Sequence, residues 1–190
     1  GDFQTVADLR AAGRLGRVWR FESRFERWKP VPTSGSWKQD PGQAGAGVLF
    51  DLGTPLVDQA LALFGPPTAV YAELATRRGP VVDDAFVALA YRDGPDVHLW
   101  ASSQAARLGP RFRVLGAEAG YVKFGMDPQE DALRAGGRPG GPGWGEDAPD
   151  AWGRLGTDGG GTEAVPTVPG AYHRFYAGVV DYLLRGAPPP

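Results

Sequence analysis

Between residues 68 and 124 apolar and polar side chains alternate in short runs separated by turn-forming residues. A period of two is the pattern of β-strands, and links this short connect antiparallel neighbours, because parallel strands need crossovers of a dozen or more residues. The pattern predicts five strands, near residues 69–76, 85–91, 97–105, 111–115 and 120–124. An open, predominantly antiparallel β-sheet is therefore the expected centre of the fold.

Helical spacing of apolar residues marks three segments outside this region. A short helix is expected around Phe3, Val6 and Leu9, and a final one from Tyr172 to Gly186. The main helix should end at Phe64, because Gly-Pro-Pro follows it. With a further strand near residues 18–25, the fold class is α+β, with the helices packed on one face of the sheet.

The segment 85–91 is apolar on both of its faces, although the chain offers few helices to cover two sides of a sheet. Its second face is covered either by loops of the same chain or by another subunit. The residues alone leave these alternatives open.

A glycine- and proline-rich passage from about residue 136 to 170 is too poor in apolar pattern to form a second core. We expect a long loop there, with Trp144 and Trp152 anchoring part of it, inside a single domain spanning residues 1–190. Gly159-Gly160-Gly161 lies in this passage without a strand pattern before it, so it is interpreted as a loop and not as a phosphate cradle.

Charge and composition exclude several classes of function. The formal net charge of −2 and the dispersed basic residues argue against a nucleic-acid partner. There is no cysteine, and two isolated histidines, His98 and His173, do not form a metal site. No apolar run approaches the ~20 residues that a membrane span requires, so no membrane partner and a cytoplasmic location are expected. Because the chain starts at Gly1, we expect an N-terminal portion to be missing.

The candidate site lies in residues 45–58, where small residues lead into an apolar helix that carries Asp51 and Asp58 on a stripe separate from its leucines. Asp51 either belongs to an active site or is a carboxylate favoured by the positive end of the helix dipole. Thr54 as N-cap and Pro55 as first helical residue predict that the regular helix begins there, after an irregular turn.

The pattern Gly45-x-Gly47-x-Leu49-x-Asp51-x-Gly53-x-x-x-x-Asp58 resembles the start of the long helix in the C-terminal domain of the Gfo/Idh/MocA oxidoreductases. Other segments resemble that domain in the same order, so the resemblance covers nearly the whole chain: residues 2–6, 13–16, 21–30, 37–38, 58–66, 82–86, 142–145, 169–172 and 175–176.

The resemblance implies a substrate-binding and dimerisation domain of an NAD(P)-dependent enzyme that acts on a sugar, polyol or related hydroxy compound. Asp51 would act at the catalytic site, Lys38 and Tyr172 would bind the small-molecule substrate, and Asp58 would support the helix or an interface. The family often associates through the open sheet face, which favours a homodimer.

Two departures from the family pattern matter. The family's usual histidine, four residues after the aspartate, is replaced by Pro55. No strand is followed by Gly-x-Gly-x-x-Gly, so NAD or NADP would be bound mainly by the missing N-terminal Rossmann domain, and this fragment alone should be inactive. The alternative is a catalytically lapsed member that serves as a sugar-binding or scaffolding module.

Overall fold

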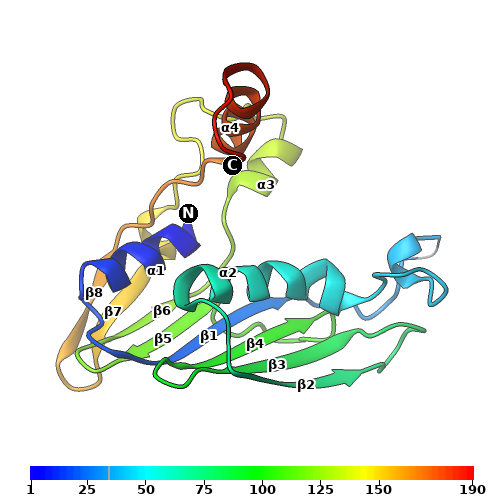
Figure 1. Ribbon diagram of the computed structural model, residues 1–190, viewed down its shortest axis with the longest axis horizontal. Helices are drawn as coiled ribbons and strands as arrows, with labels where there is room; N and C mark the ends of the chain where they lie inside the picture. The colour runs from blue at the N-terminus through cyan, green and yellow to red at the C-terminus, as the bar shows by residue number, and fades with distance from the viewer. Residues whose placement is uncertain (34) are drawn as a thin grey trace.

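The computed structural model, described here for residues 1–33 and 35–190, is built around one large open sheet with two helices lying along one of its faces (Figure 1). The strand order is β2-β3-β4-β1-β5-β6-β7-β8. All neighbouring strands are antiparallel except β1 and β4, which run parallel. The strands are β1 Val18–Glu26, β2 Ala69–Ala75, β3 Asp84–Ala90, β4 Asp96–Ser102, β5 Phe112–Gly116, β6 Gly120–Lys123, β7 Gly153–Thr157 and β8 Gly161–Val165.

The expected α+β class and the five alternating strands are confirmed. The core lies between the sheet and two helices, α1 (Asp2–Ala11) and α2 (Thr54–Phe64). Each helix buries one stripe of apolar side chains against strand residues that alternate with outward-facing ones. The buried set includes Val6, Leu9, Phe21, Leu52, Leu56, Ala60, Leu63, Val87, Leu89, Val97, Leu99, Phe112, Val114 and Tyr121.

The start of α2 is irregular, as the sequence predicts. A single π-helical turn, η2 (Leu49–Gly53), runs directly into the helix, and Pro55 falls in its first turn, where a missing N–H costs little. The expectation that Thr54 caps the helix is wrong. Thr54 is itself helical, and its hydroxyl donates to the Phe50 carbonyl oxygen at 2.8 Å, because the preceding turn already continues the helix.

Residues 136–170 are not one long loop, which corrects the sequence prediction. They contain a short helical turn, η3 (Pro149–Ala151), and the β7–β8 hairpin, which extends the sheet beyond β6. Although glycine weakens strands, β7 forms here because it pairs with β6. Gly159 and Gly160 lie in the hairpin turn, as expected for a loop, and Trp144 and Trp152 donate their indole N–H groups to Gln129 and the Asp147 carbonyl.

A buried ion cluster ties the start of the chain to this second half. The Lys123 side chain at the end of β6 is fully buried, and its ammonium lies 3.5 Å from Asp2 Oδ1 and 3.1 Å from Asp147 Oδ2. It also donates to the Phe124 carbonyl oxygen at 2.8 Å. Both carboxylates are almost fully buried as well, so each of the three charges depends on the others.

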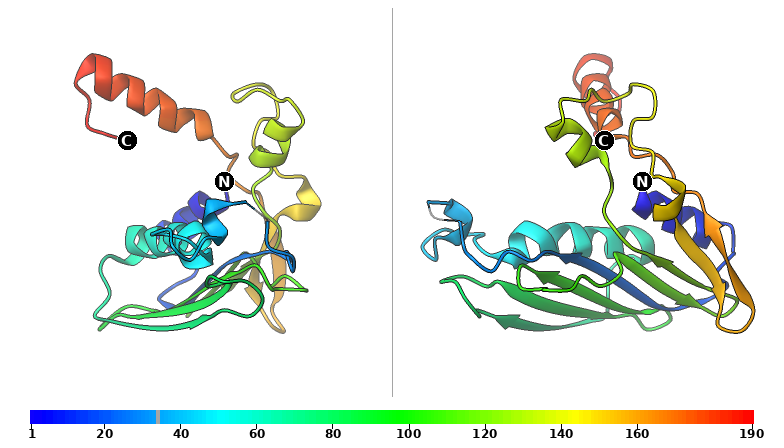
Figure 2. Two further views of the ribbon diagram at one scale, coloured as in Figure 1. Left: turned by 90° about the vertical axis from the view of Figure 1, so that its right-hand side faces the viewer. Right: turned by 180° about the vertical axis from the view of Figure 1, so that it is seen from behind.

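The last helix, α4 (Tyr172–Arg185), projects away from the sheet and from α1 and α2 (Figure 2). None of its residues is buried, although its apolar side chains follow a helical stripe. Another short helix, α3 (Gln129–Arg134), lies near its base, where Gln129 Oε1 accepts the Tyr172 backbone N–H at 2.9 Å. Within the described part of the chain, no helix is long and apolar enough to cross a membrane.

Candidate functional site

The candidate site lies at the C-terminal ends of β1 and β4, the two parallel strands in the middle of the sheet. Arg27 and Lys29 follow β1, and their backbone N–H groups donate to the carbonyls of Ser102 and Ser103, each at 2.9 Å. A short turn, η1 (Trp37–Gln39), supplies Lys38, and η2 supplies Asp51. Segments far apart in the sequence therefore meet at these strand ends.

Asp51 is the centre of this cluster, because each of its carboxylate oxygens accepts from a different cation. Lys38 Nζ donates to Oδ1, and Arg27 Nη2 donates to Oδ2 at 2.8 Å. The Asp51 side chain is only 17% exposed, whereas Arg27 and Lys38 are 46% and 44% exposed. Both cations therefore keep N–H groups that face outward from the pair.

The two cations decide the charge state of Asp51. Burial pushes the pKa of Asp51 upward, but the hydrogen bonds and charges of Lys38 and Arg27 outweigh it, so the pKa lies below its ordinary value. Asp51 is thus ionised at neutral pH. It can orient cations and accept hydrogen bonds, but it is a poor proton donor.

A close approach of the backbone holds this turn in place. Gly47 has φ of +90°, and a Cβ there would lie 2.8 Å from the Val82 carbonyl oxygen. Next to it, the Val48 N–H donates to that same oxygen at 2.8 Å, and the Asp51 N–H donates to the Gly47 carbonyl at 3.1 Å. Only glycine permits both the positive φ and the contact.

A second carboxylate, Asp83, is buried beside the cluster, but both of its oxygens accept hydrogen bonds from groups of the same chain. Its Oδ1 accepts the backbone N–H of Arg77, and its Oδ2 that of Arg78, both at 2.8 Å. Gln104 Nε2 donates to Oδ2 at 3.3 Å. Asp83 therefore fixes the loop before β3.

These groups surround a small cavity of about 50 Å³. Its lining is more polar than apolar, and it includes three cations and two carboxylates. The lining residues are Arg27, Lys29, Pro32, Thr33, Ser36, Lys38, Gln39, Gly47, Val48, Asp51, Asp83, Ser103 and Gln104.

The structure brings Asp51 and Lys38 together, but it does not bring the other two predicted residues to them. Tyr172 begins α4 and does not line the cavity. Burial and the nearby Asp127 and Glu130 raise the pKa of its phenol. Asp58 is exposed on α2 and makes no ion pair among the described residues.

Arg27 is the main site residue that the sequence did not reveal. It belongs to the loose basic group Arg20, Arg24, Arg27 and Lys29, and it lies just beyond the strand expected near residues 18–25. Its position just after a strand was the available signal. Arg27 can be recognised as a site residue only once β1 is known to lie next to β4. Sequence patterns do not reveal that pairing.

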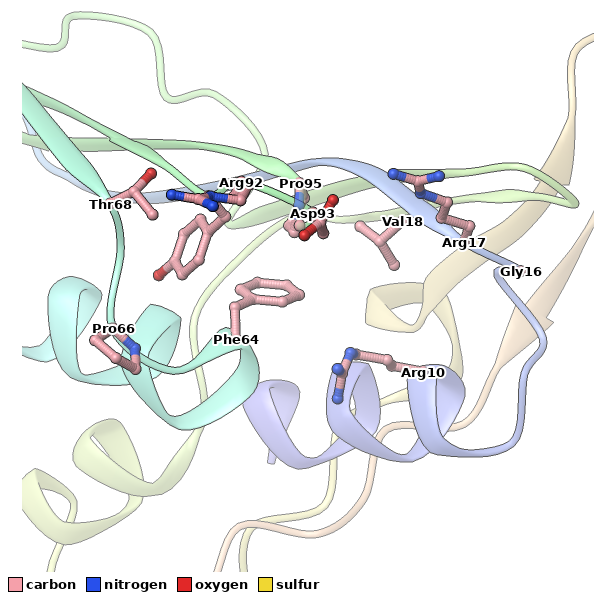
Figure 3. A pocket seen from close by; sticks show the side chains of 12 residues that line it. Arg10, Gly16, Arg17, Val18, Phe64, Pro66, Thr68, Arg92, Asp93 and Pro95 are labelled. Atoms are coloured by element: carbon pink, nitrogen blue, oxygen red, sulfur yellow. The ribbon is translucent and has the colours of Figure 1, made fainter.

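A larger hollow of about 750 Å³ lies at the opposite end of α2, around Phe64 (Figure 3). It is open, and its arginines do not converge: Arg10 lies below Phe64, while Arg17 and Arg92 lie at opposite ends of the strand edge above it. The Arg10 guanidinium stacks over the Phe64 ring at 5.4 Å. None of the predicted site residues lines this hollow.

The described residues contain no group of three or more His, Asp or Glu side chains placed to hold a metal ion. They also offer no dinucleotide cradle, because no strand among them leads through a glycine-rich turn into a helix. The triple glycine instead joins two antiparallel strands. The charged groups that line the cavity beside Asp51 are carboxylate, ammonium and guanidinium groups.

Comparison with known proteins finds relatives over nearly the whole chain. A family model described as the GFO/IDH/MocA C-terminal domain matches residues 3–122. Scyllo-inositol 2-dehydrogenase (NADP(+)) IolW of Bacillus subtilis is 34% identical over 194 residues, which cover 100% of this chain and 53% of that protein. The uncharacterized oxidoreductase YdgJ of Escherichia coli is 38% identical, over 96% of this chain and 53% of that protein.

Among solved structures, the putative oxidoreductase yvaA of Bacillus subtilis superposes with a TM-score of 0.88 at 33% identity, over 99% of this chain and 54% of that one. The chain spans about half the length of the curated relatives it matches.

Proposed function

We propose that this chain, which belongs to the Gfo/Idh/MocA family of oxidoreductases, is the substrate-binding half of an NAD(P)-dependent enzyme acting on a sugar, polyol or related hydroxy compound. The observation that carries the proposal is the pairing of Asp51 with Lys38 and Arg27 at the polar cavity. Such an arrangement presents outward-facing N–H donors, held at fixed positions by a carboxylate, to the oxygens of a substrate.

The described residues offer no dinucleotide cradle, so in this proposal the cofactor is bound by the other half of the protein. NAD or NADP bound there would exchange a hydride with the carbon that bears the substrate's hydroxyl or carbonyl group. On this chain, Lys38 and Arg27 would hydrogen-bond substrate oxygens, and Asp51 would hold both cations in place. Because its pKa is lowered, the Asp51 carboxylate is a weak base as well as a poor proton donor, so the proton would be carried by another group.

The exposed apolar surface of α4 favours the view that the other half of the protein packs beside this helix. Phe175, Tyr176, Leu183 and Leu184 are all more than half exposed, which is costly for a surface open to water. The other half of the protein is the occupant we assign to this apolar stripe.

Turnover by the intact protein tests the proposal. We expect NAD or NADP to be reduced in the presence of at least one compound from a panel of polyols, sugars and sugar acids, followed by absorbance at 340 nm. The control is residues 1–190 alone, which should show no turnover. If no compound is turned over while one of them still binds, the lapsed, sugar-binding alternative marked by Pro55 replaces the enzyme.

We also propose that the open face of the sheet pairs two copies of the chain. On this face Phe86 and Trp100 lie 5.2 Å apart between ring centroids, and Arg24 stacks over Trp100 at 3.9 Å. Glu22 beside them is only 6% exposed and pairs with Arg113 at 3.0 Å. Aromatic side chains at the centre of this face, with the neighbouring charged residues already paired, suit it to burial against a second sheet.

Replacing Ala88 by arginine should separate the two copies. Ala88 lies at the centre of β3 between Tyr71 and His98, so the long charged side chain fits a free face but not a face packed against another sheet. We expect the unmodified protein to sediment as a dimer at micromolar concentration and Ala88→Arg as a monomer, by analytical ultracentrifugation. Ala62→Arg on the exposed side of α2 is the matched control. A dimer that persists in Ala88→Arg would place the interface elsewhere.

A further inference from the structure

The cavity beside Asp51 carries more positive charge than its own carboxylates require. Arg27, Lys29 and Lys38 line it from two separate segments. Asp51 pairs with Arg27 and Lys38 but not with Lys29. Among the described residues, Lys29 forms no ion pair at all.

Asp83, the other carboxylate in the lining, reduces the excess but does not remove it. Its two oxygens accept the N–H groups of Arg77 and Arg78 and the amide of Gln104, so it keeps its charge but offers little to a ligand. Three cations therefore face two carboxylates, which leaves one positive charge in excess. A ligand group that enters this space meets mainly hydrogen-bond donors with a net positive charge.

The size of the cavity restricts what that group can be. A volume of about 50 Å³ is room for a few groups the size of water, and it is far below the roughly 300–1,000 Å³ of pockets that enclose a whole small molecule. A sugar ring does not fit, but a single small substituent does. Arginine presents a planar pair of donors that matches the planar carboxylate, and a lysine adds a point charge.

We propose that this cavity binds the carboxylate of a sugar acid, such as a uronate or an aldonate, while the rest of the substrate lies outside it. The inference rests on the proposed function and narrows its substrate class from hydroxy compounds in general to carboxylated ones. Lys29 would be a specificity-determining residue, and Arg27 and Lys38 would divide their donors between Asp51 and the substrate.

Matched pairs of substrates test this with the intact protein. D-Glucuronate is compared with D-glucose, and D-gluconate with D-glucitol, by kcat/KM with NAD and with NADP at low ionic strength, where charges are least screened. We expect the acid of at least one pair to be preferred by about tenfold or more, the usual gain from a hydrogen bond to a charged partner. Equal rates for acid and neutral compound, or a preference for D-glucose 6-phosphate over D-glucuronate, would overturn the proposal.

Variants locate the effect. Lys29→Met should reduce the ratio of the acid's kcat/KM to that of the neutral compound several-fold. Added salt should lower this ratio more in the unmodified protein than in Lys29→Met. Arg92→Met, an exposed arginine at the far end of α2, is the matched control and should leave the ratio unchanged. If Lys29→Met and Arg92→Met behave alike, the acid preference does not arise in this cavity.

Binding measured without turnover separates this inference from the proposed function. Titration calorimetry with D-glucuronate and D-glucose, on the same variants, requires no hydride transfer. Binding of D-glucuronate that depends on Lys29, with no turnover of any compound, would remove the enzyme and keep the carboxylate site. Turnover of neutral polyols with no gain for any acid would keep the enzyme and remove the site.

Discussion

Replacing Lys123 by methionine is expected to lower the free energy of unfolding by about 3–5 kcal/mol, the usual cost of removing one partner from a buried ion cluster. The ammonium is fully buried against Asp2 and Asp147, whose side chains are 7% and 4% exposed. Without it, two carboxylates remain close together in a nearly dry environment. Burial already raises the pKa of Asp2 despite the nearby Lys123, which shows how little solvent compensates these charges.

Urea unfolding of the intact protein, followed by circular dichroism, measures this loss. Arg134→Met is the control, because the Arg134–Glu130 pair is well exposed on α3 and should change stability by no more than ~0.5 kcal/mol. Combining Lys123→Met with Asp2→Asn and Asp147→Asn should restore at least half of the loss. A loss below about 1 kcal/mol for Lys123→Met would mean that water or the two carboxyl groups compensate the missing charge.

The loss should also depend on pH with a definite sign. A carboxyl group whose pKa is raised by folding contributes stability below its unfolded pKa and loses that contribution as the pH rises through its folded pKa. In Lys123→Met the Asp2 pKa should rise further, because the cation that lowers it is gone. The deficit relative to the unmodified protein is therefore expected to shrink as the pH falls from 7 toward 4.

Most of the sheet was predictable because alternation is a local property. Strands β2 to β6 each carry enough apolar or β-branched residues to indicate a period of two. Their short links join antiparallel neighbours in β2–β3, β3–β4 and β5–β6, whereas β1 lies between β4 and β5. The β7–β8 hairpin was not predictable in this way. Only Gly153, Leu155 and Val165 are buried in it, so its strands depend on hydrogen bonds from β6 and not on a pattern of their own.

The site was predictable only in part, for a related reason. Asp51 and Lys38 were found through residues that resemble a known family, whereas Arg27 reaches Asp51 only because β1 and β4 are parallel neighbours. That pairing joins residues more than 70 positions apart, and no local pattern encodes it. Tyr172 begins a helix that projects from the body of this chain, so its predicted role at the substrate stays a prediction.

Replacing Asp51 by asparagine is expected to reduce kcat/KM of the intact protein by about 100-fold, the loss associated with a misplacement of reacting groups by roughly 1 Å. Asparagine keeps the size of the side chain but removes the charge that both Lys38 and Arg27 contact. The two cations then repel each other without a carboxylate between them, and their donors no longer occupy fixed positions. Initial rates with the best substrate of the panel measure the loss.

Asp58→Asn provides the matched control, because it is the same chemical change seven residues further along and Asp58 is exposed. It should leave kcat/KM within about twofold and stability within ~0.5 kcal/mol. A loss confined to Asp51→Asn, with the unfolding free energy lowered by no more than about 1 kcal/mol as for other partly exposed pairs, would assign the effect to the site. Equal losses in both variants would assign it to α2 as a whole.

The pH profile then separates positioning from proton transfer at Asp51. Lys38 and Arg27 hold its pKa below the ordinary value, so the carboxylate is present above that value and is lost only as the pH falls through the lowered pKa. The unmodified protein should therefore show no acid limb from Asp51 between pH 7 and 5, and Asp51→Asn should lower the whole profile without changing its shape. A limb near neutral pH that disappears in Asp51→Asn would make Asp51 the proton carrier, because only a group that titrates in that range gives such a limb.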